Sequence, residues 1–227
     1  MATEKLCQWA NFQPSDRVLE LASSFSYSAI SLVEHYHVKV IGIEENPESV
    51  PIARVKIRAA GLENKIETIE GDIFHLDKIP GKFDYVLAEA ILTMQSPQGK
   101  AKLLTEIHNR LKLRSKFLSH ELLANEKETE ISTDSAKVIK VNSTPLSVIH
   151  WIQVFTQAGL QVQKYETAAM SLLSWWRMLQ DEGIINTMQI FLEYLDKTTY
   201  PTTGFRNASS FPKISARTRL YSYLCCY

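Results

Sequence analysis

Short apolar strands alternate with amphipathic helices over the first two thirds of this chain, and this alternation is what most restricts its fold. Apolar runs predict strands, and apolar residues at three- and four-residue spacing predict helices. The predicted strands are 17–21, 38–43, 66–69, 83–88, 117–123 and 160–165, and the predicted helices between them are 28–36, 47–60, 100–111 and 146–158. Such alternation builds βαβ units, so we expect an α/β fold with a doubly wound, mostly parallel sheet.

The remainder of the chain departs from the alternation. Its 227 residues suit a single α/β domain with an elaboration, and we expect its core at about 14–166. Two predicted helices, 170–180 and 184–195, form a helical insertion at about 168–198, before the last strand. They either pack simply on the sheet or form a lid over the strand ends. Residues 199–227 are predicted to contain a loop followed by a last strand near 219–227.

Composition and charge exclude several classes of protein. Apolar residues make up 45% and charged residues 22% of the chain, which excludes a disordered or fibrous protein. The formal net charge is zero, so we expect no nucleic-acid partner held by phosphate neutralisation. Residues 197–227 contain five basic and no acidic residues. This basic end is either solvated or a docking surface for an anionic partner.

Three cysteines, Cys7, Cys225 and Cys226, form neither a disulfide framework nor a zinc-binding spacing. This pattern suits a reducing compartment. We find no signal peptide at the N-terminus and no apolar run of the roughly 18 residues needed to span a membrane. We therefore expect a cytoplasmic protein with no metal and no membrane partner.

Four acidic residues stand in or shortly after successive predicted strands: Glu20, Glu44, Asp72 and Glu89. In a doubly wound sheet, ligands bind beyond the carboxyl ends of the strands. Carboxylates at that edge accept hydrogen bonds from the hydroxyls and amines of a nucleoside-bearing ligand. Any one of them alone is more often a helix cap or a solvated loop residue. Their repetition at one edge predicts a binding crevice.

The same strand ends resemble those of the class I S-adenosylmethionine-dependent methyltransferases, from about Arg17 to Leu123. The segments that carry the resemblance are Val18-Leu19-Glu20-Leu21, Val40-Ile41-Gly42-Ile43-Glu44, Glu70-Gly71-Asp72-Ile73 and Phe83-Asp84-Tyr85-Val86-Leu87-Ala88. The resemblance implies a Rossmann-like methyltransferase fold and S-adenosyl-L-methionine as cofactor.

The resemblance also implies roles for individual residues. Glu44 would hold the ribose hydroxyls, Asp72 would face the adenine amino group, and Ile73 would pack on the adenine ring. Ala88 and Glu89 would border the reacting centre. The cofactor-binding residues implied in this way are Glu20, Ala22, Ser24, Ser26, Glu44, Asp72, Ile73 and Ala88.

The loop after the first predicted strand differs from that family's pattern. Ala22, Ser24 and Ser26 stand where the family has glycines, which let the backbone approach the ligand. Phe25 lies between Ser24 and Ser26, and Tyr27 directly follows Ser26. We expect these two rings either to pack in the core under the first helix or to fill the pocket themselves.

Candidate catalytic residues are few, because methyl transfer depends mainly on alignment and the exclusion of water. His120, near the end of the fifth predicted strand, is either structural or a general base. Glu89 is the second catalytic candidate. Glu121 is predicted to face the substrate as well, and residues 93–95 are predicted to contact it.

These observations predict S-adenosylmethionine-dependent methyl transfer to a small-molecule acceptor. The alternative is a non-catalytic, methyltransferase-like binding or scaffold protein that has lost cofactor binding along with the glycines. A nicotinamide-dependent oxidoreductase is disfavoured, because no Gly-x-Gly-x-x-Gly follows the first predicted strand.

Overall fold

The computed structural model describes residues 2–124, 144–169 and 219–226. The chain divides into two compact units, Met1–Ala168 together with Arg217–Tyr227, and Ala169–Ala216. The described residues belong almost entirely to the first unit, which is the subject below. The predicted helices at 170–180 and 184–195 lie outside the described residues and stay predictions.

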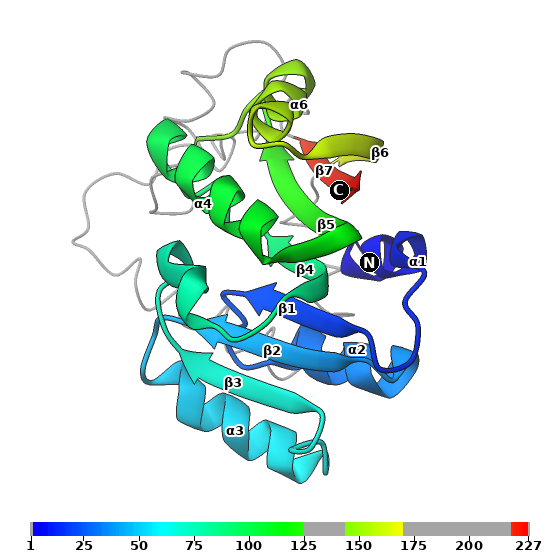
Figure 1. Cartoon of the computed structure of the whole chain (residues 1–227), viewed down its shortest axis with the longest axis vertical. Coiled ribbons are helices and arrows are strands. Elements are labelled where there is room, and N and C mark those ends of the chain that lie inside the picture. Colours follow the sequence, from blue (N-terminus) through cyan, green and yellow to red (C-terminus); the bar gives the residue numbers. More distant parts are fainter. Residues whose placement is uncertain (1, 125–143, 170–218, 227) are drawn as a thin grey trace, which may run out of the picture. The chain divides into compact units, whose positions relative to one another are not determined.

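The described strands form one seven-stranded sheet in the order β3-β2-β1-β4-β5-β7-β6 (Figure 1). Their bounds are β1 Arg17–Leu21, β2 Lys39–Glu44, β3 Ile66–Glu70, β4 Phe83–Glu89, β5 Leu111–Leu123, β6 Gln161–Ala169 and β7 Arg219–Cys226. From β3 through β5 all neighbouring pairs are parallel, and β7 runs antiparallel to β5. This confirms the predicted doubly wound, mostly parallel sheet, with β1 and β4 adjacent.

Six helices are described around this sheet. They are α1 Ala2–Ala10, α2 Tyr27–Tyr36, α3 Ser49–Ala59, the 3₁₀ helix η1 Ile73–Lys78, α4 Pro97–Arg110 and α6 Val148–Gln157. Neither α1 nor η1 was predicted. A 3₁₀ helix lacks the 3.6-residue period on which the prediction relies.

Two predicted helix starts were displaced. The helix predicted at 47–60 begins only at Ser49, as α3, and the preceding Asn46 accepts a hydrogen bond from Glu48 N through its Oδ1. Helix α4 begins earlier than predicted, at Pro97, because the Ser96 hydroxyl caps it by accepting from Gly99 N. A capping side chain thus sets the start of α4, whereas Glu48, the N-cap of α3, makes no side-chain capping bond.

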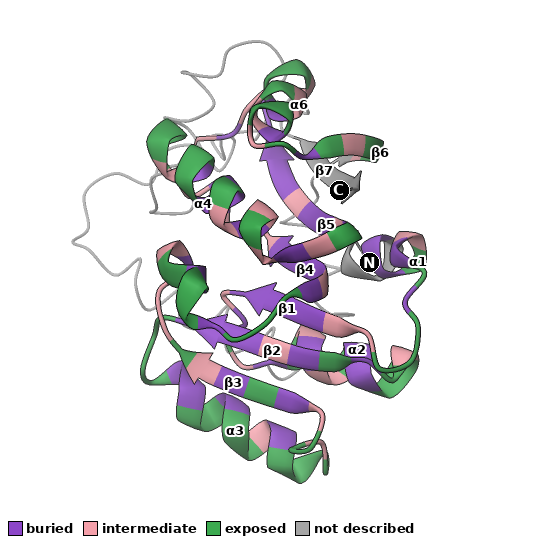
Figure 2. Cartoon of the chain, in the orientation of Figure 1, coloured by how far each residue is buried: buried purple, intermediate pink, exposed green. Residues whose placement is uncertain are grey.

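Each face of the sheet has its own apolar core, because successive strand residues point to opposite sides. Leu19 belongs to the cluster on the side of α4 and α6, where Trp151 is fully buried. Val18 belongs to the cluster on the side of α1 and α2. The central strands are buried along most of their length (Figure 2). Burial on both faces is what a parallel sheet covered by helices requires.

Strand order and register place three of the predicted site residues on one face of the sheet. Glu20 is the register partner of Leu87, and Glu89 is the partner of His120. Since residues two apart on a strand share a face, Glu20, Glu89 and His120 all lie on the α1 and α2 side. They come from the neighbouring strands β1, β4 and β5.

Candidate functional site

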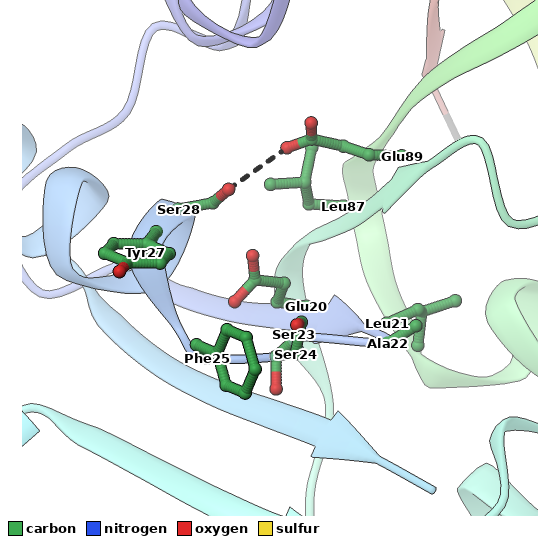
Figure 3. A pocket seen from close by; sticks show the side chains of 10 residues that line it. All are labelled: Glu20, Leu21, Ala22, Ser23, Ser24, Phe25, Tyr27, Ser28, Leu87 and Glu89. Carbon is green, nitrogen blue, oxygen red and sulfur yellow. Dashed lines mark hydrogen bonds between the residues drawn. The ribbon is translucent and has the colours of Figure 1, made fainter. Parts of the chain in front are cut away.

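A cavity of about 210 Å³ lies at the carboxyl end of β1, under the loop that leads into α2 (Figure 3). Its walls come from β1, this first loop, the start of α2 and the end of β4. The lining residues are Glu20, Leu21, Ala22, Ser23, Ser24, Phe25, Tyr27, Ser28, Leu87 and Glu89. This is the edge of the sheet at which ligands of doubly wound folds bind.

The first loop takes glycine-like backbone conformations without containing glycine. The φ angles of Ala22, Ser24 and Ser26 are 53°, 47° and 60°, in the left-handed region that side chains disfavour by about 1–2 kcal/mol per residue. Backbone bonds support this shape, since Ser23 N donates to Ile43 O at 3.0 Å and Ser26 N to Ser23 O at 2.7 Å. The loop therefore keeps the backbone path that the missing glycines would favour.

Glu44, at the end of β2, binds the backbone of this loop. Its Oε2 accepts from Ser24 N at 2.7 Å, and its Oε1 accepts from Asn46 N at 2.8 Å. The Glu44 side chain is nearly buried. Each carboxylate oxygen has a second lone pair for a further donor. Glu44 is thus bonded to the rim of the cavity, although it is not among the lining residues.

Glu20 is the buried acid of the cavity. Its Oε2 is buried and has no hydrogen-bond partner among the described residues. Burial, together with the nearby Glu89 carboxylate, raises the pKa of Glu20 to about 8, against the opposing effect of a hydrogen bond from Ser28. Glu20 is therefore mostly protonated at neutral pH.

Glu89 stands on the other side of the cavity from the first loop. Its Oε1 accepts a hydrogen bond from the Ser28 hydroxyl at 3.3 Å (Figure 3). Ser28 lies in the first turn of α2, so it connects the helix to β4. The sequence prediction missed Ser28, although the helix that follows the first loop was the place to look for it.

Two aromatic side chains border the cavity instead of packing in the core. Tyr27 is 64% exposed, and Phe25 is half-buried, so of the two arrangements expected for these rings, packing in the core does not occur. Both line the cavity, and about 210 Å³ of space remains between its walls. Lys56 Nζ donates to the Tyr27 hydroxyl and lies 4.2 Å from the ring centroid, which holds the ring at the rim.

Ser23 lines the cavity at the point where the first loop packs against β2. Its Oγ is buried and has no hydrogen-bond partner in the described part of the chain. A Cβ at Gly42 would lie 2.6 Å from this oxygen and 2.7 Å from Ser23 Cβ, so Gly42 is needed for the loop to approach β2. The sequence prediction did not identify Ser23 as a lining residue.

Thr93 and Glu121 do not face a substrate, contrary to prediction. Both side chains are fully buried. Glu121 accepts from Leu92 N at 3.2 Å, from Thr93 N at 2.8 Å and from the Thr93 hydroxyl at 2.5 Å. It follows His120 on β5 and so points to the opposite face of the sheet from the cavity. Burial raises the pKa of Glu121 to about 7 despite these bonds.

The other predicted residues lie outside the cavity lining. His120 Nε2 is buried without a described partner, and burial lowers the pKa of the ring. Asp72 Oδ1 accepts from Phe74 N at 2.7 Å and caps η1. Ile73 and Ala88 are buried in the core on the α4 side. The structure thus brings Glu20, Ala22, Ser24 and Glu89 together around one cavity.

Within the described ranges, no group of three or more His, Cys, Asp or Glu side chains is placed to bind a metal ion. Over the same ranges, no helix has the length and apolar character needed to cross a membrane.

Comparison with known proteins agrees with this geometry. Residues 18–113 match the methyltransferase domain family. An uncharacterised protein of Haemophilus influenzae is 31% identical over 191 residues, which cover 83% of this chain and 76% of that protein. Residues 18–113 therefore form a methyltransferase domain of the class I type, and the cofactor of this domain is S-adenosyl-L-methionine.

More distant relatives share parts of the chain or the fold alone. The L-tyrosine C(3)-methyltransferase of Streptomyces lavendulae is 27% identical over 112 residues, 49% of this chain and 30% of that enzyme. A Thiobacillus denitrificans S-adenosylmethionine-dependent methyltransferase, solved with S-adenosyl-L-homocysteine, superposes with a TM-score of 0.67 at 15% identity, covering 100% of this chain and 90% of that one. For the geranyl diphosphate C-methyltransferase of Streptomyces coelicolor the TM-score is 0.71 at 10% identity, over 99% and 78%.

The residues of the cavity fit such a cofactor. Glu20 presents a buried oxygen that has no described partner, next to the carboxylate of Glu89. A buried acceptor of this kind is stabilised when a cationic hydrogen-bond donor reaches it. S-adenosyl-L-methionine carries an ammonium and a sulfonium group beside one carboxylate, so its net positive charge complements the acidic lining.

Proposed function

We propose that this chain transfers the methyl group of S-adenosyl-L-methionine to a small-molecule acceptor. The observation that carries the proposal is the first loop. It keeps left-handed conformations at Ala22, Ser24 and Ser26 and is bonded to Glu44. A loop that had only lost its glycines would be free to relax these strained angles. Retention of this path supports a cofactor-binding protein over a scaffold.

The residues implied by the family resemblance take distinct parts in this proposal. Glu20 and the first loop receive the charged end of the cofactor. Glu44 uses its remaining lone pairs for the ribose hydroxyls, and Asp72 and Ile73 serve the adenine. The cavity of about 210 Å³ is smaller than the roughly 300–1,000 Å³ of typical ligand sites. In this proposal the cavity therefore binds one part of the cofactor, and the strand ends at Glu44 and Asp72 bind the rest.

The bound cofactor supplies the electrophilic methyl carbon, and the chain's own residues have to align the acceptor and exclude water. Glu89 and His120 are the catalytic candidates, because they lie side by side on the cavity face of the sheet. Burial lowers the pKa of His120, so its ring is neutral at neutral pH. We assign His120 Nε2, which has no partner among the described residues, the role of proton acceptor from the methyl acceptor.

Two observations support a small acceptor. The net charge of zero does not favour a nucleic acid held by its phosphates. The matched enzyme of Streptomyces lavendulae is by name a methyltransferase of tyrosine, which is a small molecule.

The proposal is tested with S-adenosyl-L-methionine that is labelled in its methyl group. Incubation with a cell extract should place label in the fraction that passes a filter of a few kilodaltons. Glu44→Ala should abolish transfer, since it removes the acceptor of Ser24 N, and the exposed Glu67→Gln on β3 is the matched control. Label confined to protein or nucleic acid contradicts the small-molecule acceptor. Failure of the wild type to bind S-adenosyl-L-homocysteine contradicts the function itself.

A further inference from the structure

The carboxylate of Glu121 binds the turn that follows Glu89. Its Oε2 accepts hydrogen bonds from Thr93 N at 2.8 Å and from the Thr93 hydroxyl at 2.5 Å. Its Oε1 accepts from Leu92 N at 3.2 Å and from the Ser119 hydroxyl at 2.9 Å. Since a carboxylate has about four lone-pair sites in total, these bonds leave Glu121 no capacity for a ligand.

The chain turns directly after Glu89, and β5 binds it there. Ala90 N donates to His120 O at 2.6 Å, so hydrogen bonding between β4 and β5 continues beyond Glu89. Ala90 then takes a left-handed conformation with a φ of 57°, which side chains disfavour. A strained turn persists only where its surroundings hold it. Here β5 holds the turn through the backbone N–H groups of Ala90, Leu92 and Thr93.

The far end of the turn is held separately. Lys100 is 1% exposed, and its Nζ donates to Gln95 O at 2.6 Å. Thr144 Oγ1 donates to the same oxygen at 2.5 Å. These bonds lie further along the chain from Glu89 than those of Glu121, so Glu121 is the side chain that fixes the near end of the turn.

Glu121 reaches this turn from the face of the sheet opposite the cavity. Glu89 and His120 are register partners on β4 and β5, and both lie on the cavity face. Glu121 follows His120 on the strand and points to the other face, where it is fully buried. A shift of the turn changes the direction in which Glu89 leaves β4, and with it the spacing of the two catalytic candidates.

From this arrangement we infer that Glu121 is a positioning residue for methyl transfer: by binding two backbone N–H groups of the turn, it fixes Glu89 relative to His120. The inference rests on the proposed function, in which these two residues serve the methyl acceptor. A misplacement of about 1 Å can lower a rate about a hundredfold. The first loop and Glu44, which bind the cofactor in that proposal, are bonded to each other, so we expect cofactor affinity to be independent of Glu121.

Glu121→Gln tests the inference with little change of shape. Whichever way the amide is turned, its NH₂ group faces either Leu92 N or Thr93 N, so one bond to the turn is lost. Transfer of label from S-adenosyl-L-methionine is measured against increasing amounts of the small-molecule fraction of a cell extract. We expect the limiting rate to fall at least about tenfold. The half-saturating amount, and the affinity for S-adenosyl-L-homocysteine measured by isothermal titration calorimetry, should stay unchanged.

Two further variants separate positioning from stability. Ser119→Ala removes a hydrogen bond to the same carboxylate but none to the turn. It should lower the melting temperature and keep the transfer rate of the wild type. Glu121→Asp keeps the charge but withdraws the carboxylate by one methylene group. It should lose limiting rate without losing affinity for S-adenosyl-L-homocysteine, and it replaces Glu121→Gln if that variant does not fold.

Native-state hydrogen exchange, followed by NMR, measures the turn directly. At least one of the Leu92 and Thr93 amides should exchange at least about tenfold faster in Glu121→Gln than in the wild type. The amides of Leu103 and Leu104, inside α4, should exchange equally in both. Unchanged exchange at both Leu92 and Thr93 would contradict the inference.

The failure of the inference and that of the proposed function are distinguishable. If Glu121→Gln transfers label as fast as Ser119→Ala, or if its rate and its cofactor affinity fall together, Glu121 is a structural residue only. The inference is then overturned, and the proposed function stands. If the wild type transfers no label to the small-molecule fraction, the proposed function fails, and the inference fails with it.

Discussion

At the scale of single residues, the first loop shows how backbone shape can persist after the residue that favours it is gone. Ala22, Ser24 and Ser26 all have positive φ angles. Their strain is held in place by bonds from outside the loop, above all by the Glu44 carboxylate on Ser24 N. Ser26 is fixed as well, with its buried hydroxyl 3.2 Å from that of Thr68. Contacts from other segments therefore stabilise the left-handed conformations that glycine would adopt without strain.

Replacing a strained residue with glycine should not destabilise this protein. We expect Ala22→Gly to raise the free energy of unfolding by about 0.5 kcal/mol, because relief of about 1–2 kcal/mol of left-handed strain exceeds the 0.5–1 kcal/mol entropic cost of glycine. Ala29→Gly, in the buried face of α2, is the control and should destabilise by about 1 kcal/mol. Urea unfolding measures both, and equal losses in the two variants would contradict the strain argument.

At the scale of elements, β5 holds the loop between β4 and α4 through buried polar groups. The Thr93 hydroxyl donates to Glu121 and accepts from Leu122 N at 3.1 Å. Thr144 and Lys100 extend the contacts, since Thr144 N donates to Thr93 O and Lys100 Nζ donates to Gln95 O. Burial lowers the pKa of Lys100 to about 8, against the attraction of Glu121. The loop after Glu89 is thus fixed from the side of the sheet opposite the cavity.

The Thr93 hydroxyl should account for much of this attachment. Thr93→Val keeps the shape but leaves Leu122 N and one Glu121 oxygen short of a partner, and should cost about 1–3 kcal/mol of stability. Thr93→Ser keeps the hydroxyl and should cost about 1 kcal/mol for the lost methyl group. Denaturant unfolding of both variants provides the comparison. A larger loss in Thr93→Ser than in Thr93→Val would show that packing dominates at this position.

At the scale of the whole molecule, the buried acid in the cavity makes stability depend on pH. The folded chain binds the Glu20 proton more tightly than the unfolded chain, since the pKa is raised from 4.5 to about 8. The stability contributed by this proton is complete below about pH 4.5 and is lost as pH rises through about 8. Ligand-free protein should therefore lose stability over this range on account of Glu20.

Glu20→Gln should remove that part of the pH dependence, because the amide cannot ionise. Thermal unfolding of wild type and variant at pH 5, 6.5 and 8.5, without ligand, measures it. We expect the melting temperature of the variant to gain on that of the wild type as pH rises. Comparing the two chains cancels the effect of Glu121, which titrates in both. A difference that stays constant from pH 5 to 8.5 would mean that Glu20 is ionised throughout.

The sequence determined the strands, their mostly parallel arrangement and the edge at which acidic residues gather. These properties follow from local periodicity and from the geometry of βαβ units, and short segments of the sequence are enough to specify both. It also located Glu20, Glu44 and the altered first loop. The family resemblance turned these positions into a cofactor prediction, and the comparisons confirmed the cofactor.

What surrounds each acid depends on the way the chain folds. His120 and Glu121 are adjacent in sequence, yet one stands beside Glu89 on the cavity face and the other is buried under the β4–α4 loop. Likewise, Glu20 lines the cavity, whereas Asp72 caps a short helix. The physical reason is that the burial of a carboxyl group, its partners and its pKa depend on segments far away in the chain, which local sequence patterns do not record.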